Sequence, residues 1–259
     1  MTFVSFSDWL AQAPAWFQNW PEWIQNFAFQ FYQTFIYADR YMFFVNGLKI
    51  TFIVTIGALI LGVIIGLFIA IIRVSHDAVV GKKPNIILRI FNRICIWYLT
   101  IIRGTPMMVQ LLIMGFVVMV PETETQCVIC GIVTLGINSG AYVAEIARSG
   151  IMSIDAGQME AGRSVGFNYV QTMWYVIIPQ AFKNILPALG NEMITLLKDT
   201  SLVSVIALRD VTKQAQNIVS LTYQAYVPYI SLAVIYLVIV IIMTKLLGIL
   251  ERRLRQNER

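Results

Sequence analysis

Three charged side chains, Glu192, Lys198 and Asp199, lie inside a long apolar stretch of the chain. Glu192, Thr195 and Asp199 are spaced at i, i+3 and i+7, so a helix would place them on one face. A charge at the centre of a membrane helix costs roughly 2.5–3.5 kcal/mol, so these side chains must face a cavity or other helices. Fixed charges of both signs suit a zwitterionic solute. A structural ion-pair network explains the same pattern equally well.

A second polar stripe lies in an earlier apolar stretch, where Asn138, Tyr142 and Glu145 follow at i, i+4 and i+7. Ionisable groups inside a membrane face the bundle or water and are functional candidates by default. Arg148 follows Glu145 by three residues, so a simple interfacial ion pair is the alternative for that acid. The predicted substrate-pathway residues are Asn138, Glu192, Thr195, Lys198, Asp199, Thr200 and Ser201.

A polar segment, MEAGRSVGFNYVQTMWYVIIPQ at 159–180, separates these two stretches. Asp155 is followed three residues later by Gln158, and Asn168 by Gln171, which are two capping-box spacings. Gly166 between them fits the left-handed residue that stops a helix. The pattern therefore predicts two short helices about a glycine bend.

The second of these short helices is expected to end at Pro179, which lacks an N–H and clashes with the preceding turn. Both helices are too polar to insert into a membrane and too short to be stable alone. They need a partner that covers an apolar surface formed by Met159, Val165, Trp174 and Val176.

The composition indicates that these segments belong to a membrane protein. Of 259 residues, 58% are hydrophobic and 13% are charged, whereas soluble domains carry about 25% charged residues. About 20 apolar residues in a helix cross a bilayer, and the backbone in lipid must be satisfied within its own helix. We expect an all-α integral membrane protein with five spans, at about 45–72, 98–120, 127–147, 185–208 and 227–247.

The basic residues predict the orientation of the spans. They gather after the first, third and fifth spans: Arg73, Lys82, Lys83, Arg89, Arg93, Arg103, Arg148, Arg163, Lys183, Lys245, Arg252, Arg253, Arg255 and Arg259. The positive-inside rule then places the N-terminus outside and the C-terminus in the cytoplasm. The loop at about 153–180 and the basic tail at 251–259 become cytoplasmic. The net charge of +5 reflects this topology, and we expect no nucleic-acid partner.

Residues 1–40 form an aromatic arm ahead of the transmembrane region at 41–250. Trp16, Trp20, Trp23, Phe27 and Phe31 recur every three or four residues, as on one face of a helix. Trp and Tyr favour the headgroup zone of a bilayer. We predict an amphipathic helix on the outer leaflet, with a docking surface for an extracytoplasmic partner as the alternative.

Small residues at fixed spacing predict where helices pack closely. Gly62 and Gly66 form a G-x-x-x-G pair, and Gly136, Gly140 and Ala144 stand four apart; such spacings let helix backbones approach each other.

Cysteine and histidine give no catalytic or metal site. Cys127 and Cys130 form a C-x-x-C pair, and the only histidine, His76, is expected on the opposite side of the membrane. A redox or metal role needs more ligands, so we interpret both cysteines as packing residues.

The segment EAGRSVGFNYVQTMWYVIIP resembles the EAA loop of binding-protein-dependent ABC transporter permeases. Glu160, Ala161, Gly166 and Pro179 keep the full spacing of that motif, with Arg163 between them. Gly162 replaces the second alanine. A glycine costs roughly 1 kcal/mol of helix stability relative to alanine, which leaves open whether it loosens this helix or makes room for the partner.

The resemblance extends from about Asn46 to Leu250. NGLKITFIVT, RGTPMMVQLL, SGAYVAEIARSGI and LPALGNEMITLLKDTSLVSVI are similar to the polar amino-acid uptake branch of these permeases, the histidine and glutamine permease type. This implies a type I ABC importer permease fold with a cytoplasmic coupling helix, in the plasma or inner membrane. It also implies a cytoplasmic ABC ATPase dimer, an extracytoplasmic amino-acid-binding protein and a second permease subunit, identical or different.

ATP and Mg²⁺ would bind the partner ATPase, because the sequence contains no G-x-x-x-x-G-K-[ST] loop. The chain itself is expected to bind no cofactor and to catalyse no reaction. An ion-coupled secondary amino-acid transporter is the rival interpretation. Such transporters usually carry internal repeats, for which five spans offer no paired halves.

Overall fold

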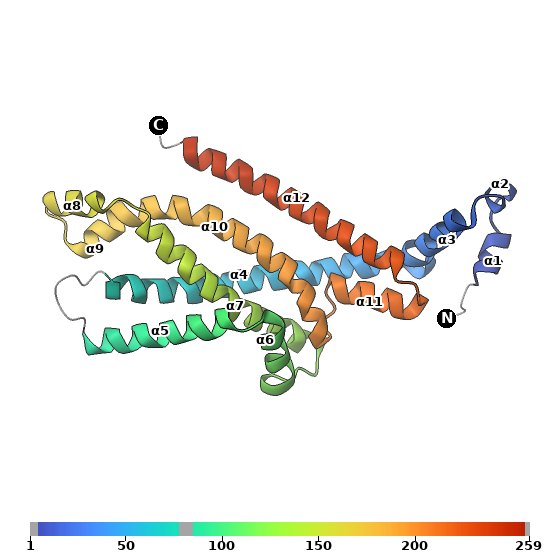
Figure 1. Cartoon of the computed structure of the whole chain (residues 1–259), viewed down its shortest axis with the longest axis horizontal. Helices are drawn as coiled ribbons and strands as arrows, with labels where there is room; N and C mark the ends of the chain where they lie inside the picture. The colour runs from blue at the N-terminus through green and yellow to red at the C-terminus, as the bar shows by residue number, and fades with distance from the viewer. Residues whose placement is uncertain (1–4, 78–84, 257–259) are drawn as a thin grey trace. The chain divides into compact units, whose positions relative to one another are not determined.

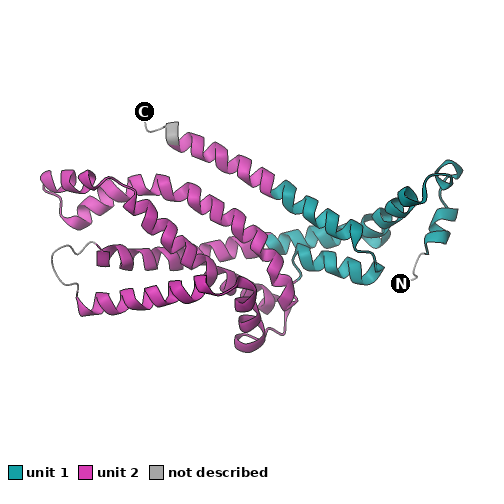
Figure 2. Cartoon of the chain, viewed as in Figure 1, with its two compact units in different colours: residues 1–51, 209–239 teal, residues 52–208, 240–259 magenta. Residues whose placement is uncertain are grey.

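The computed structural model describes residues 5–77 and 85–256, and within them every regular element is helical (Figure 1). The expected all-α fold is therefore confirmed. Lys82, Lys83 and Arg259 lie outside the described residues. The chain divides into two compact units (Figure 2): unit 1 comprises residues 1–51 and 209–239, and unit 2 comprises residues 52–208 and 240–259.

Three helices of the described chain are long and apolar enough to cross a membrane: α4 (Tyr41–Asp77), α7 (Glu124–Met152) and α12 (Tyr226–Gln256). The second span expected at about 98–120 is interrupted by a bend. Helix α5 (Ile86–Gly104) and the segment of α6 (Met107–Ile113) and η3 (Met114–Val118) meet at an angle of 104°. The bend falls at Thr105 and Pro106. Proline lacks a backbone N–H donor and disfavours helical geometry at the residue before it.

The count of five spans is not confirmed. Taking the bent pair as one span, the described residues contain up to four candidates. Helix α10 (Ile178–Asp199), followed by the 3₁₀-helix η5 (Thr200–Ile206), falls short of the apolar requirement. The reason is its composition, since it carries Lys183, Glu192, Lys198 and Asp199.

Helix α7 lies at the centre of unit 2, against α4, α5 and α10. The predicted glycine spacings on α4 and α7 pack against one another. A Cβ at Gly66 would lie 2.6 Å from Val143 Cβ, and one at Gly136 would lie 2.8 Å from Leu61 Cδ2. Such short approaches exclude larger side chains, so the two helices owe their close contact to these glycines.

The N-terminal arm in unit 1 is not one amphipathic helix. It forms α1 (Phe6–Ala11), α2 (Ala15–Gln18) and α3 (Glu22–Phe31), because Pro14 and Pro21 interrupt the chain. The π-helix η1 (Tyr32–Ile36) and the 3₁₀-turn η2 (Tyr37–Asp39) then lead into α4. Of the expected aromatic face, Trp23, Phe27 and Phe31 share α3 and are exposed.

The remainder of unit 1 packs around α11 (Val211–Thr222), whose first turn is capped by Asp210. Val211, Ala215 and Ile218 are fully buried, together with Phe44 at the start of α4. A Cβ at Gly47 would lie 2.7 Å from Val211 Cα, so α4 touches the backbone of α11 there.

Candidate functional site

The first predicted short helix is present as α8 (Ala156–Ser164). It begins at Asp155, whose carboxylate accepts a hydrogen bond of 2.7 Å from Gly157 N–H. It stops at Gly166, which has a φ of +91°. The N–H of Phe167 donates to the carbonyl of Gly162, and that of Gly166 to Arg163, which is the pairing of a Schellman motif. The bend is therefore fixed by the local sequence.

The second short helix, α9 (Tyr169–Thr172), begins with the predicted capping box between Asn168 and Gln171. Its expected end at Pro179 is wrong. A π-helical turn, η4 (Met173–Ile177), follows and runs directly into α10, where Pro179 stands in the first turn. In η4 the N–H of Ile178 reaches the carbonyl of Met173. A first turn needs no N–H from proline, so the helix continues.

Gly162, the departure from the motif, lies where α8 touches α9. It is buried, and a Cβ there would lie 2.4 Å from Thr172 Cγ2 and 2.8 Å from its hydroxyl oxygen. Thr172 itself is fully buried and donates to the carbonyl of Asn168. The glycine therefore lets the two short helices close into a hairpin, an explanation that neither sequence-based alternative contained.

The α8–α9 hairpin, residues 155–177, presents polar and apolar side chains together on its surface. Glu160, Ala161 and Arg163 are exposed. Of the predicted apolar surface, Val165 and Trp174 are exposed, at 77% and 65%, whereas Met159 and Val176 are half-buried. Three further apolar side chains that the sequence pattern did not single out are also exposed: Val170, Tyr175 and Phe167.

A cavity of about 500 Å³, here called the α10 cavity, opens between α5, α6, α7 and α10. Four of the predicted pathway residues line it: Asn138, Glu192, Thr195 and Asp199. The other three do not. Lys198 is exposed, Ser201 is half-buried and Thr200 is buried.

Hydrogen bonds fix the polar groups of the α10 cavity. Glu192 Oε1 accepts from the Ser139 hydroxyl at 2.7 Å, and the Asn138 amide donates to Gln110 Oε1 at 3.0 Å. Gln110 in turn donates to the carbonyls of Ile102 and Thr105 at the end of α5. The Gln110 side chain thus donates to backbone carbonyls at the C-terminal end of α5 and also accepts the hydrogen bond from Asn138.

Arg103 is a cavity residue whose charge was interpreted, from the sequence, only as an indication of membrane orientation. It lies in the last turn of α5, where a helix end favours a cation, and its guanidinium carbon sits 5.5 Å from the centre of the Tyr142 ring. The sequence feature that could have identified Arg103 is its position in the RGTP motif, three residues before Pro106. Arg103 lines the α10 cavity together with Tyr142.

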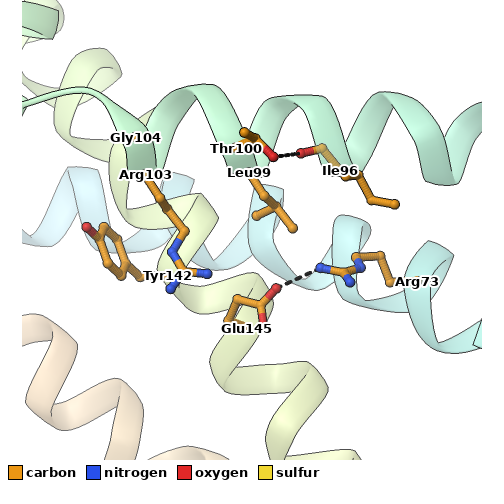
Figure 3. Close-up of a pocket in the computed structure, with 8 residues that line it drawn as sticks. All are labelled: Arg73, Ile96, Leu99, Thr100, Arg103, Gly104, Tyr142 and Glu145. Carbon is orange, nitrogen blue, oxygen red and sulfur yellow. Dashed lines mark hydrogen bonds and ion pairs between the residues drawn. The ribbon is translucent and has the colours of Figure 1, made fainter.

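A second cavity of about 540 Å³, here called the α4 cavity, is also lined by Arg103 and Tyr142 (Figure 3). Its charged lining residues are Arg73, Arg103 and Glu145. Glu145 Oε1 lies 2.7 Å from Arg73 Nη1, and its Oε2 lies 3.6 Å from Arg148 Nη2. The predicted ion pair between Glu145 and Arg148 is present, but its charged atoms lie farther apart than those of the Arg73–Glu145 pair.

Sequence comparisons agree with this architecture. The profile of the family described as binding-protein-dependent transport system inner membrane component matches residues 78–256. The arginine transport system permease protein ArtQ of Bacillus subtilis (strain 168) is 36% identical, over 83% of this chain and 94% of its own. The glutamine transport system permease protein GlnP of Escherichia coli (strain K12) is 33% identical, over 82% and 92%.

Solved structures show the same fold. An amino acid ABC transporter crystallised with histidines superimposes with a TM-score of 0.73 at 44% identity, covering 82% of this chain and 94% of that one. An inward-facing MetNI methionine ABC transporter has a TM-score of 0.67 at 18% identity, covering 82% and 96%; at that identity it supports the fold alone. On its sequence match and its fold, the chain belongs to the inner membrane component family of binding-protein-dependent transport systems.

Proposed function

We propose that this chain is the membrane-spanning permease subunit of an ABC importer that carries a polar amino acid into the cytoplasm. The α8–α9 hairpin is the observation that carries this proposal. It is braced by its own caps and by the Gly162–Thr172 contact, yet it exposes Val165 and Trp174 to solvent. Exposed apolar surface rimmed by polar residues marks a protein interaction site.

In this proposal α8 docks in a cleft of a separate cytoplasmic ABC ATPase dimer. ATP and Mg²⁺ bind there, and this chain binds neither. An extracytoplasmic binding protein delivers the amino acid, and a second permease subunit, the same or a different chain, completes the path. The names of ArtQ and GlnP, an arginine and a glutamine permease, support an amino acid as cargo. Nothing in the comparisons supports an ion-coupled secondary transporter.

The proposed orientation places the N-terminus outside and the C-terminus in the cytoplasm, in a multi-pass protein of the cell membrane. The aromatic arm would then lie in the outer headgroup zone. Its exposed tryptophans, Trp16, Trp20 and Trp23, support this placement, since amphipathic indole rings favour the interface. Residues 1–39 contain no lysine or arginine, which agrees with an external position.

The α10 cavity is the proposed solute route. Arg103 offers a guanidinium for the carboxylate of an amino acid, and Glu192 and Asp199 offer carboxylates for its ammonium group. Arginine binds a carboxylate through two parallel hydrogen bonds. Asn138 and Thr195 add neutral polar groups on the same wall. Lys198, Thr200 and Ser201 do not line this cavity, so they have no direct contact role in the proposal.

Reconstitution of the complete complex with its ATPase and binding protein tests this function. We expect ATP-driven uptake of at least one of the twenty labelled proteinogenic amino acids, with none when the ATPase cannot hydrolyse ATP. Uptake by the chain alone, driven by an ion gradient, would instead establish the rival mechanism.

The coupling role is tested by Glu160→Lys, which reverses an exposed charge on α8. We expect ATP hydrolysis to continue while uptake falls at least about tenfold, the effect of roughly 1.4 kcal/mol, because the docked face no longer fits. Glu122→Lys is the matched control, since Glu122 is an exposed acid outside the hairpin. Normal uptake by Glu160→Lys at normal expression would remove the coupling assignment.

A further inference from the structure

The α10 cavity and the α4 cavity share one wall. Arg103, Gly104 and Tyr142 line both of them. Figure 3 shows Arg103 reaching from the end of α5 toward Tyr142 and Glu145 on α7. The two cavities are therefore neighbours that share the Arg103 guanidinium and the Tyr142 ring, whose centre lies 5.5 Å from the guanidinium carbon.

The two cavities differ in the sign of their charge. The charged residues that line the α10 cavity are Arg103 and two acids, Glu192 and Asp199. In the α4 cavity, Arg73 and Arg103 face one carboxylate, Glu145. That carboxylate already accepts from Arg73 and also lies within 4 Å of Arg148. The first cavity therefore favours a cationic group, and the second favours an anionic one.

We propose that the α4 cavity is a second binding station, which holds the α-carboxylate of the transported amino acid between Arg73 and Arg103. The inference rests on the proposed function and deepens it. The amino acid first binds in the α10 cavity, with its carboxylate on Arg103. It then passes the Arg103–Tyr142 contact into the α4 cavity without leaving that guanidinium.

The other groups of the α4 cavity fit this ligand. The Thr100 hydroxyl already donates to the carbonyl of Ile96 at 2.8 Å, so its oxygen is left to accept from an ammonium group. Leu99 and Ile96 supply an apolar wall. The two cavities, of about 540 and 500 Å³, both lie within the roughly 300–1,000 Å³ typical of small-molecule sites.

The contact between Arg103 and Tyr142 is weak enough for a bound ligand to open it. The attraction of a guanidinium to an aromatic ring is small at exposed sites, and Arg103 belongs to the exposed residues of the chain. A carboxylate forms a stronger, two-hydrogen-bond pair with arginine. A bound amino acid therefore displaces Arg103 from Tyr142 at little cost, and the side chain returns to the ring when the ligand leaves.

The stoichiometry of binding tests this station. The nucleotide-free complex of permease and ATPase, in nanodiscs without binding protein, is equilibrated with radiolabelled L-arginine and, separately, L-glutamine. We expect the better ligand to occupy two sites per permease chain. Arg73→Gln should weaken one site at least about tenfold, the loss of one charge-assisted pair, and Asp199→Asn should weaken the other. Agmatine, which is arginine without its carboxylate, should not displace label from the Arg73 site.

Arg148→Gln is the matched control. It removes a guanidinium from the same carboxylate, Glu145, but Arg148 does not line the cavity; both sites should therefore remain. Arg73→Lys should keep the site with intermediate affinity, which separates loss of charge from misfolding. A single site per chain that Asp199→Asn removes and Arg73→Gln leaves would overturn the proposal, as would equal weakening by Arg148→Gln. Absence of any ATP-driven amino-acid uptake by the wild-type complex would instead overturn the proposed function.

Discussion

The bend of the α8–α9 hairpin and the break between α5 and α6 are both interruptions of helix, but different interactions stabilise them. The hairpin turns at Gly166, and its caps come from Asp155 and Asn168 close by in sequence. The break at Thr105 is held by Gln110, which is itself bonded to Asn138 on α7, 28 residues further along the chain. The first conformation is encoded locally, and the second requires the folded bundle.

This difference matches the two roles that we propose. A hairpin that carries its own caps can keep its shape while it moves against a partner protein. A break that is tied to α7 keeps Arg103 in place beside the two cavities and links their shape to the packing of the helices. Stabilisation by nearby residues suits an element that docks on a partner, whereas stabilisation by contacts between helices suits a binding route inside the bundle.

Gly166→Val should give the largest effect, because it attacks the local encoding directly. A β-branched residue at a φ of +91° costs roughly 1–3 kcal/mol of backbone strain. We expect ATP-driven uptake in proteoliposomes to fall at least about tenfold, with helicity of the spans unchanged by circular dichroism. Gly166→Asn, which tolerates positive φ better, should retain more uptake. Equal activity of both variants and wild type would show that the bend has no part in coupling.

Gly162→Ala should have the next largest effect. Its new Cβ would approach Thr172 Cγ2 to 2.4 Å, and such overpacking costs roughly 1–3 kcal/mol. We expect a severalfold loss of uptake, about fivefold for 1 kcal/mol, and a recovery when Thr172→Ala is added. The double variant restores an alanine at the motif position together with the space it needs. A double variant no better than Gly162→Ala would contradict the packing explanation.

Gln110→Ala tests whether the break between α5 and α6 depends on its hydrogen bonds through Gln110. It leaves the carbonyls of Ile102 and Thr105 without this donor, at roughly 1–3 kcal/mol. We expect a lower midpoint of thermal unfolding in detergent and a partial loss of uptake. In a double-mutant cycle with Asn138→Ala, a coupling of about 1 kcal/mol should appear. Additive effects of the two substitutions would mean that the break does not depend on α7 through this bond.

The pH dependence of α11 should give the smallest effect. Asp210 combines a local cap with full burial: it accepts from Thr212 and Lys213 at 3.0 and 2.9 Å. Burial raises the pKa of its carboxyl from 3.8 to about 6, and the hydrogen bonds oppose this shift. The folded state then binds more protons than the unfolded one between these values. Stability is greatest below pH 3.8 and is lost as the pH rises through about 6.

Amide hydrogen exchange of α11, corrected for intrinsic rates, measures this effect. Wild-type protection should be higher at pH 5 than at pH 7, and Asp210→Asn should remove most of that difference. A rise of protection between pH 5 and pH 7 in the wild type would contradict the raised pKa.

Several sequence-based predictions were confirmed because their causes are local. The all-α membrane fold follows from composition, and the hairpin caps follow from Asp155, Asn168 and Gly166. At Asp155, however, the carboxylate accepts from Gly157 N–H, in place of the capping box expected with Gln158. Close helix packing at Gly66 and Gly136 follows from glycine spacing, and the structure shows that the partners are α4 and α7. Predictions that treated proline as a simple stop were wrong at Pro179, where the π-turn η4 lets the helix continue. The single N-terminal helix was wrong for the opposite reason, because Pro14 and Pro21 interrupt it.

The sequence alone determined the class of the protein, its family and the hairpin. Hydropathy, caps and motif spacing act between near neighbours in the chain, and the sequence displays them directly. The reason for a glycine at 162 became visible in the folded hairpin, since Thr172 lies ten residues away across a bend. Only the fold brought Arg103 beside Tyr142 and both cavities. Glycine spacing predicts that helices pack closely, but which side chains meet around a cavity depends on bend angles and helix rotations that no local pattern specifies.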